Sequence, residues 1–166
     1  MKRRNFLILG SILGISPYLQ AKSTNSTSKE FNQLRATFEA VQEHLFPSGN
    51  LIPSAKAMKL TEFLYSTISH QSFDRDIRAF ILKGAKKLDK RTKGKFTTMS
   101  YEQKERTLRE YEKTRFGGNW LGRIVTLSME GLFGDPIYGS NIGEAGWKSI
   151  DTYGGNPRPT TKYLGV

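Results

Sequence analysis

The chain has 166 residues, of which 37% are apolar, and a formal net charge of +11 from 26 lysines and arginines against 15 acids. This length fits one domain with a single core. The absence of cysteine excludes disulfides, thiolate zinc sites, iron–sulfur clusters and c-type haem attachment within the chain. Because most basic residues are interleaved with acids, we expect no nucleic-acid partner.

Residues 1–22 have the parts of an export signal: a basic start, an apolar run over 6–15 and a break at a proline. The apolar run is shorter than the roughly 20 residues that a membrane span needs. Four residues resemble the twin-arginine signal, which directs folded proteins to the twin-arginine translocase: Arg3, Arg4, Phe6 and Leu7. We therefore predict a periplasmic protein, with a membrane anchor or an ordinary secretory signal as the alternatives.

A polar linker over 23–30 is expected to precede a helical bundle over 31–133. Thr27 and Glu30 have the spacing of a capping box, which predicts the start of the first helix. Apolar residues then recur at spacings of three and four, the pattern of one buried helical stripe: Phe31, Leu34, Phe38, Val41 and Leu45.

Two further helices follow from similar stripes. Pro53 is placed to open the second helix, which is expected to end near His70. The third is predicted over 73–88, with a charged connection over 89–94. Gly84 lies on its apolar face and is expected to permit close contact with another helix.

The last two helices differ sharply in polarity. A capping box of Ser100 and Gln103 starts the fourth helix, over 101–114, whose narrow apolar edge predicts an outer position. The glycines at 117 and 118 are expected to break it, and Asn119 to cap a fifth helix. This fifth helix is apolar or small nearly all round, which predicts a central, buried position.

An irregular arm is predicted over 134–166. The stretch 131–159 holds seven of the sixteen glycines and four aromatic residues, with no helical or alternating period. Structureless loops of this length are uncommon inside compact domains, and disordered tails are poor in aromatic residues. We therefore interpret the arm as a surface for a partner. Trp147 is either an anchor in a partner pocket or a side chain that folds back over the bundle.

Catalytic patterns are weak. His44 and His70 are the only histidines and lie on different predicted elements, so no metal site is expected. Glu39 and Glu43 are four residues apart but fall off the apolar stripe, which favours a solvated face over paired catalytic carboxylates. The arm glycines lack the preceding strand and spacing of a dinucleotide loop. We predict no catalytic residues in this chain.

Several motifs together resemble the small subunit (subunit 3) family of gluconate 2-dehydrogenase. They are a Leu-Phe-Pro turn over 45–47, Gly-Leu-Phe-Gly-Asp-Pro over 131–136, Tyr-Gly-Ser-Asn over 138–141, Gly-Trp over 146–147 and Tyr-Gly-Gly over 153–155. The family more often has Gly-Gly-Asn where this chain has Gly-Ser-Asn over 139–141. The resemblance and the residue types suggest these partner-binding positions: Asp135, Pro136, Tyr138, Gly139, Asn141, Gly146, Trp147 and Tyr153.

The resemblance implies a non-catalytic small subunit of a periplasmic, membrane-associated, flavin-dependent sugar or sugar-acid dehydrogenase. Such a subunit would supply the export signal and help its flavoprotein large subunit to mature and assemble. FAD would belong to that large subunit and haem c to a multihaem cytochrome subunit, with no cofactor in this chain. The alternative is an independent secreted basic protein that binds anionic polymers or membrane surfaces through 86–95. The predicted fold class is all-α: one small bundle of about five helices, with an N-terminal export signal and a long irregular arm rich in glycine and aromatic residues.

Overall fold

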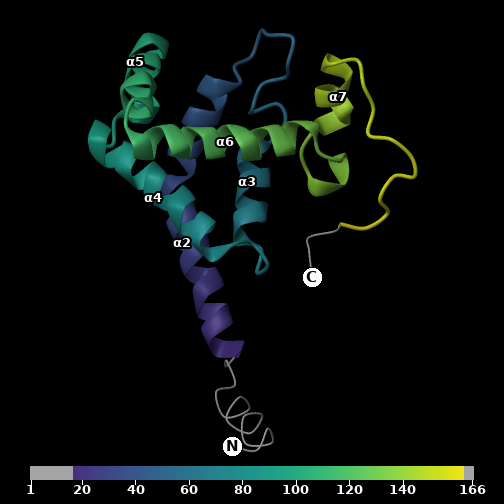
Figure 1. The fold of residues 1–166 in the computed structure, drawn as a ribbon, viewed down its shortest axis with the longest axis horizontal. Helices are drawn as coiled ribbons and strands as arrows, with labels where there is room; N and C mark the ends of the chain where they lie inside the picture. The colour runs from purple at the N-terminus through teal and green to yellow at the C-terminus, as the bar shows by residue number, and fades with distance from the viewer. Residues whose placement is uncertain (1–16, 163–166) are drawn as a thin grey trace, which may run out of the picture.

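The computed structural model describes residues 17–162, with side chains from residue 26 onward, and this part of the chain is all-α as predicted (Figure 1). The predicted export-signal residues Arg3, Arg4, Phe6 and Leu7 lie outside the described residues. No described helix combines the length and apolar character that a membrane crossing requires. The α-helices are α2 (Pro17–Leu45), α3 (Leu60–Ser69), α4 (Arg75–Thr92), α5 (Tyr101–Glu112), α6 (Arg115–Phe133) and α7 (Ala145–Ser149). Short 3₁₀ turns are η1 (Phe96–Thr98), η2 (Pro136–Tyr138) and η3 (Ile142–Glu144).

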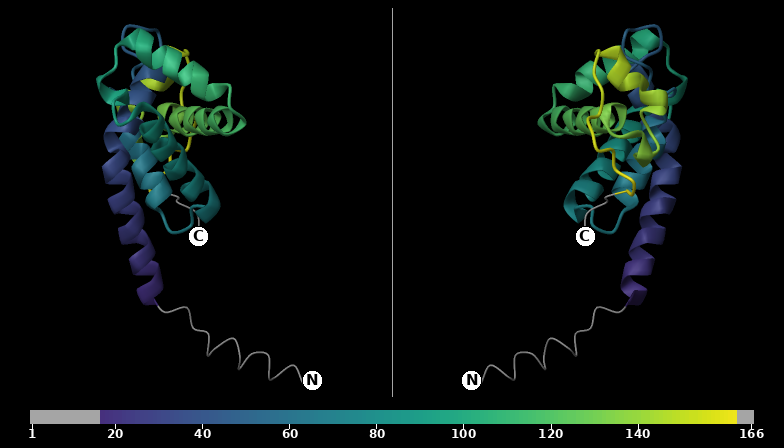
Figure 2. Two further views of the ribbon diagram at one scale, coloured as in Figure 1. Left: turned by 90° about the vertical axis from the view of Figure 1, so that its left-hand side faces the viewer. Right: turned by 90° about the vertical axis from the view of Figure 1, so that its right-hand side faces the viewer.

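Helix α2 carries the predicted apolar stripe, and its N-terminal end projects beyond the other helices (Figures 1 and 2). The prediction that the helix starts at a capping box on Thr27 is wrong, because α2 begins at Pro17 and runs through the expected linker over 23–30. The polar residues of this stretch bind to residues of other helices, so they do not end α2. The Ser28 hydroxyl lies 2.7 Å from that of Tyr65 on α3, and Glu30 pairs with a lysine of α4.

The segment between α2 and α3 is a loop rather than the expected early start of the second helix. Pro53 does not open α3, which begins seven residues later at Leu60. The loop closes through the Ala55 amide, which donates to the Phe46 carbonyl at 2.9 Å. Lys59 then takes a left-handed conformation (φ 54°), which a continuous helix could not contain.

Helix α4 confirms the predicted close approach at Gly84. A methyl group at this position would overlap the indole ring of Trp120 on α6. The indole N–H of Trp120 donates to the Ile81 carbonyl at 2.9 Å, and the Tyr111 hydroxyl donates to the Gly84 carbonyl at 3.1 Å. The helix is longer than predicted, ending at Thr92, because residues expected to form a charged connection remain helical. Lys90 and Arg91 are favourable in this last turn, where they lie near the negative end of the helix dipole.

The boundary between α5 and α6 also differs from the prediction. The predicted capping box of Ser100 and Gln103 is present at the start of α5. Gly117 and its neighbour lie inside α6 rather than breaking the chain, and Thr114 is the cap instead of Asn119, its hydroxyl accepting from the Gly117 amide at 2.9 Å. A side chain on Gly117 would overlap the Tyr111 carbonyl, so glycine allows two helices to meet across a two-residue turn.

Helix α6 is central as predicted, since it contacts α2, α3, α4, α5 and α7. The prediction that it is buried nearly all round is wrong, because only one face packs into the main core while the opposite face, with Asn119, Gly122 and Thr126, is exposed. A smaller apolar cluster lies at the far end of α6, near Leu60 and Leu132. One polar residue, Gln42, is fully buried on α2. Its side chain donates to the Ser128 hydroxyl at 2.9 Å and accepts from the Thr61 hydroxyl at 2.7 Å, linking α2, α3 and α6. Fully buried core side chains include Phe31, Phe38, Val41, Leu64, Ile68, Ile81, Leu88, Phe96, Trp120 and Ile124.

Candidate partner-binding arm

The arm begins with a turn immediately after α6. Asp135 caps η2, its carboxylate accepting from the Ile137 amide at 2.9 Å, and Pro136 occupies the first position of the turn. Tyr138 is half-buried, and Gly139 ends the turn with φ 88°, a conformation that favours glycine. The turn sends the chain back along the end of the bundle (Figure 2).

Asn141 is fully buried and connects two parts of the arm. Its side-chain amide donates to the Gly134 carbonyl at 2.8 Å, and its side-chain oxygen accepts from the Gly146 amide at 2.8 Å. Gly146 lies so close to the Leu132 carbonyl that a side chain there would overlap it. Both residues therefore hold the arm against the end of α6.

Trp147 is turned inward, which is one of the two positions considered from the sequence. Its side chain is buried, and the indole N–H donates to the Phe133 carbonyl at 2.6 Å. A methyl group on Gly154 would overlap the outer edge of the ring, so the returning chain covers it closely.

Arg158 fastens the end of the arm, a role that the sequence analysis missed. Its guanidinium pairs with Asp135 at 2.9 Å and with Glu144 at 3.3 Å, and it lies 4.4 Å from the centre of the Trp147 ring. These contacts span 23 residues of sequence and follow no period. The one available signal was an arginine between two prolines in a stretch otherwise poor in charge.

Three large apolar side chains between residues 134 and 162 are open to solvent: Ile142, Ile150 and Tyr153, which are 41%, 50% and 74% exposed. We call them the arm face. Among the eight positions suggested from the sequence, Tyr153 is thus exposed, whereas Asn141, Gly146 and Trp147 are buried.

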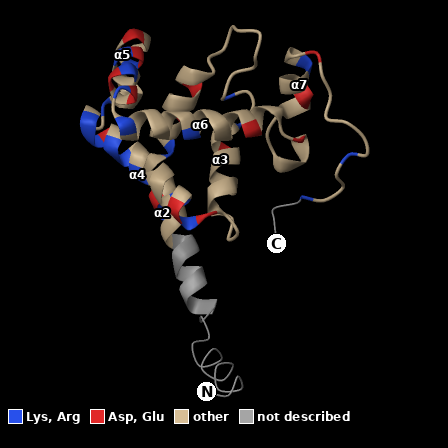
Figure 3. Ribbon diagram, in the orientation of Figure 1, with Lys and Arg blue, Asp and Glu red and all other residues tan. Residues whose placement is uncertain are grey.

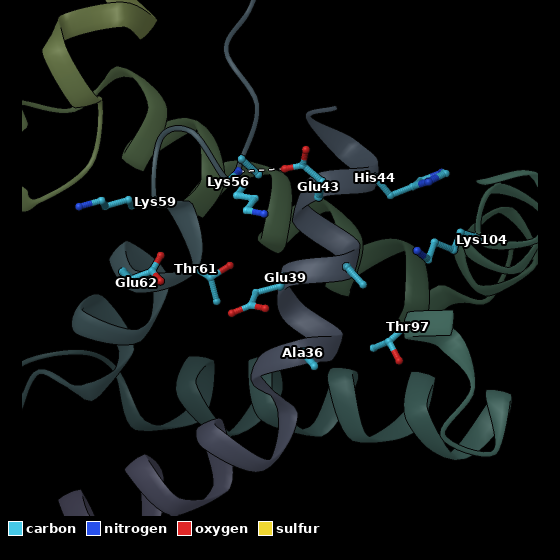
Figure 4. Close-up of a pocket in the computed structure, with 12 residues that line it drawn as sticks. Ala36, Glu39, Glu43, His44, Lys56, Lys59, Thr61, Glu62, Thr97 and Lys104 are labelled. Atoms are coloured by element: carbon cyan, nitrogen blue, oxygen red, sulfur yellow. Dashed lines mark hydrogen bonds between the residues drawn. The ribbon is translucent and has the colours of Figure 1, made fainter. Parts of the chain in front are cut away.

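A groove of about 810 Å³ runs across the outer face of α2, between α3 with its preceding loop and the η1–α5 region (Figure 4). Glu39 and Glu43 project from α2 into this region, and Glu43 accepts from the Lys56 backbone amide at 2.9 Å. Acidic and basic side chains are mixed along its walls. The described residues contain no cluster of metal-binding side chains.

His44 lies at the edge of this groove and connects α2 with α5. It is buried, its Nε2 lies 2.7 Å from a Glu105 carboxylate oxygen, and its ring lies 4.6 Å from that of Tyr101. The hydrogen bond from His44, together with that from Arg109, lowers the pKa of Glu105. His70 instead contacts Ser72 at an exposed turn, so the two histidines belong to separate sites.

The small all-α bundle carries an ordered arm whose exposed apolar side chains are typical of a surface that contacts another chain. The chain belongs to the gluconate 2-dehydrogenase subunit 3 family, whose model matches residues 32–155. Membership implies association with other subunits of a gluconate dehydrogenase complex. Comparisons with curated proteins and with solved structures gave no match.

Proposed function

We propose that this chain is the non-catalytic small subunit of a periplasmic, membrane-associated, flavin-dependent sugar or sugar-acid dehydrogenase. The observation that carries the proposal is the family match over 32–155, which includes the bundle and the arm as far as Tyr153 and its neighbours. Catalysis belongs to a flavoprotein large subunit that holds FAD, and a multihaem cytochrome c subunit accepts the electrons. The small subunit exports, matures and holds the flavoprotein.

The arm face is the contact with the large subunit. Tyrosine is enriched at interface hot spots, and Tyr153 is the most exposed aromatic residue among the described side chains. Arg158 and Trp147 fix the path of the chain on either side of it. An arm held in place before binding loses less conformational entropy when the partner arrives. In this proposal Asp135, Asn141 and Gly146 act by positioning the arm.

Export follows from Arg3, Arg4, Phe6 and Leu7, which form a twin-arginine signal. A flavoprotein must bind its cofactor and fold in the cytoplasm, so a docked small subunit with this signal carries both chains across the membrane. The arm contact therefore forms before export and remains afterward.

The test of the arm is co-purification of the tagged small subunit with its flavoprotein partner from the native host. We expect Tyr153→Ala to weaken the complex by about 30-fold, the effect of a hot spot worth about 2 kcal/mol. Tyr101→Ala is the matched control, since Tyr101 is 58% exposed on α5, away from the arm (Figure 1). Equal recovery of flavoprotein with both variants would contradict the arm contact.

The test of export is the double change Arg3→Lys and Arg4→Lys. We expect the small subunit and the flavoprotein both to accumulate in the cytoplasm, with dehydrogenase activity lost from the periplasmic side. Cell fractions probed for both chains give the result. Normal periplasmic activity in this variant would remove the carrier role.

A further inference from the structure

The C-terminal half of α4 and the turn after it form a strongly basic surface. Lys83, Lys86, Lys87 and Lys90 recur at spacings that place them on one face of the helix. The opposite face holds the buried residues of this part of the helix: Ile81, Leu82, Gly84, Ala85, Leu88 and Thr92. Figure 3 shows the basic residues gathered at this end of α4. We call the following set the basic ridge: Lys83, Lys86, Lys87, Lys90, Arg91, Lys93 and Lys95, all of them exposed.

Only part of this charge has an internal role. Lys86 pairs with Glu30 at 3.0 Å, and the Lys87 amine lies 3.8 Å from the centre of the Phe116 ring. Cations near the end of α4 also gain from the helix dipole. Within residues 26–162, however, no carboxylate lies within 4.0 Å of the remaining four lysine amines: Lys83, Lys90, Lys93 and Lys95. Asp89 is the one acid in the stretch 83–95, and Glu110 of α5 interacts with Arg91, so the seven cations of the ridge are only partly compensated.

The residue types of the basic ridge indicate which kind of anion it binds. Six of its seven cations are lysines, which act as hydrated point charges, whereas fixed recognition of single phosphates or carboxylates favours the bidentate geometry of arginine. The stretch 83–95 contains no aromatic residue on which a nucleic-acid base could stack. The ridge is also the outer face of a helix. These features suit diffuse attraction to a planar layer of phosphates.

We propose that the basic ridge is a membrane-surface site that lies against the headgroup phosphates of anionic phospholipids. The contact is peripheral and electrostatic, and no apolar insertion is involved. It does not depend on the dehydrogenase assignment, because it rests on the charge and placement of α4 alone.

The position of the ridge leaves the arm accessible. Contacts of Gly84 with Trp120 and of Lys87 with Phe116 place this half of α4 beside the start of α6. The arm packs at the other end of α6, through Trp147 and Phe133. Figure 1 shows the two at opposite ends of the molecule, so a membrane surface and a partner chain can be bound at the same time.

The test is co-sedimentation of the full chain with phospholipid vesicles. One set contains phosphatidylglycerol and phosphatidylcholine in equal amounts, and the other contains phosphatidylcholine alone. We expect binding to the anionic vesicles that weakens as salt is added. Each lysine near an anionic surface contributes about fivefold to the binding constant. Changing Lys83, Lys86, Lys87 and Lys90 together to Gln should therefore weaken binding by at least about 30-fold, the share of two lysines in contact, and by up to about 600-fold, the share of all four.

A variant with the same net charge provides the matched control: Lys56, Lys104, Lys148 and Lys162 changed to Gln. We expect it to bind anionic vesicles within about threefold of the wild type, a smaller loss than that of lysines in surface contact. Both variants keep the basic and apolar N-terminal residues, so any contribution from that segment is common to them. Circular dichroism and thermal melting verify that each variant is folded.

Three results would overturn the proposal. The first is equal loss of binding in the two variants, which would assign the effect to net charge. The second is equal binding of the wild type to the two kinds of vesicle. The third is tighter binding of duplex DNA than of anionic vesicles at the same phosphate concentration, which would assign the ridge to nucleic acid.

Discussion

The bundle and the arm are stabilised by different kinds of contact. The bundle buries apolar stripes that repeat every three or four residues, with Phe31, Phe38 and Ile124 fully buried among them. The arm is held by hydrogen bonds and ion pairs of single residues, mainly Asn141 and Arg158. Changes in the bundle should therefore lower the free energy of unfolding of the whole chain, whereas changes in the arm should release the arm alone.

The largest expected effect is on the contact of α4 with α6. Gly84→Ala should lower the free energy of unfolding by about 3 kcal/mol, because the added methyl group overlaps the buried indole of Trp120. Gly122→Ala is the control: this helical glycine faces open space, so the change should stabilise the chain by about 0.5–1 kcal/mol. Urea unfolding followed by circular dichroism measures both. Stabilisation by both changes would show that the helices are not in close contact.

The next effect tests whether the arm behaves as a separate unit. Asn141→Ala leaves a buried carbonyl and a buried amide without partners, at a cost of about 2–3 kcal/mol. We expect faster hydrogen exchange at the Gly146 amide and faster proteolysis after residue 134, with exchange in α4 and α6 unchanged. Asn119→Ala, at an exposed position of α6, should leave the arm protected. Equal loss of protection in the arm and in α6 would mean that the two unfold together.

A pH measurement sharpens the description of the bundle. Burial raises the pKa of Tyr111 to about 12, so the folded state favours the neutral phenol. Its stabilising contribution is fully present below the unfolded-state pKa of about 10 and is lost as the pH rises to about 12, by about 2–3 kcal/mol in all. Tyr111→Phe should remove this part of the pH dependence, whereas Tyr153→Phe, at an exposed position, should keep it. Identical pH profiles for the two variants would contradict the burial of Tyr111.

The smallest effect concerns the fastening of the arm. Arg158→Gln removes the pairs with Asp135 and Glu144 and the contact with the Trp147 ring. Because the Arg158 side chain is itself partly exposed, we expect a loss of about 1 kcal/mol in the arm alone. Acrylamide quenching of tryptophan fluorescence should increase, since Trp120 stays buried and Trp147 becomes accessible. Arg115→Gln serves as the control at an exposed position. Unchanged quenching in Arg158→Gln would mean that Trp147 stays covered without the guanidinium.

The difference between periodic packing in the bundle and single-residue contacts in the arm explains what could be predicted from the sequence. The spacing of apolar and small residues correctly predicted the all-α class, the stripe of α2, the central position of α6 and the close contact at Gly84. Helix boundaries were harder to predict, because they depend on contacts with residues far away in the sequence. Ser28 and Glu30 stay helical through contacts with α3 and α4, and the Gly117 region stays helical because it packs against α5.

The arm could be located from its composition, but its internal contacts could not. Nothing in the spacing of Asp135 and Arg158 indicates that they pair, and a tryptophan beside glycine can face either inward or outward. Gln42 was missed for a similar reason, since its partners come from two other helices. Such pairings become visible only when the fold brings the residues together.

The length of α6 has a geometric consequence. Its 19 residues correspond to about 28 Å along the helix axis, with the lysine-rich end of α4 beside its first turns and the folded-back tail beside its last. The buried face of α6 packs against the neighbouring helices, so the distance between its two ends is fixed by the fold. With both proposed contacts formed, α6 would act as a spacer between the lipid headgroups and the bound enzyme.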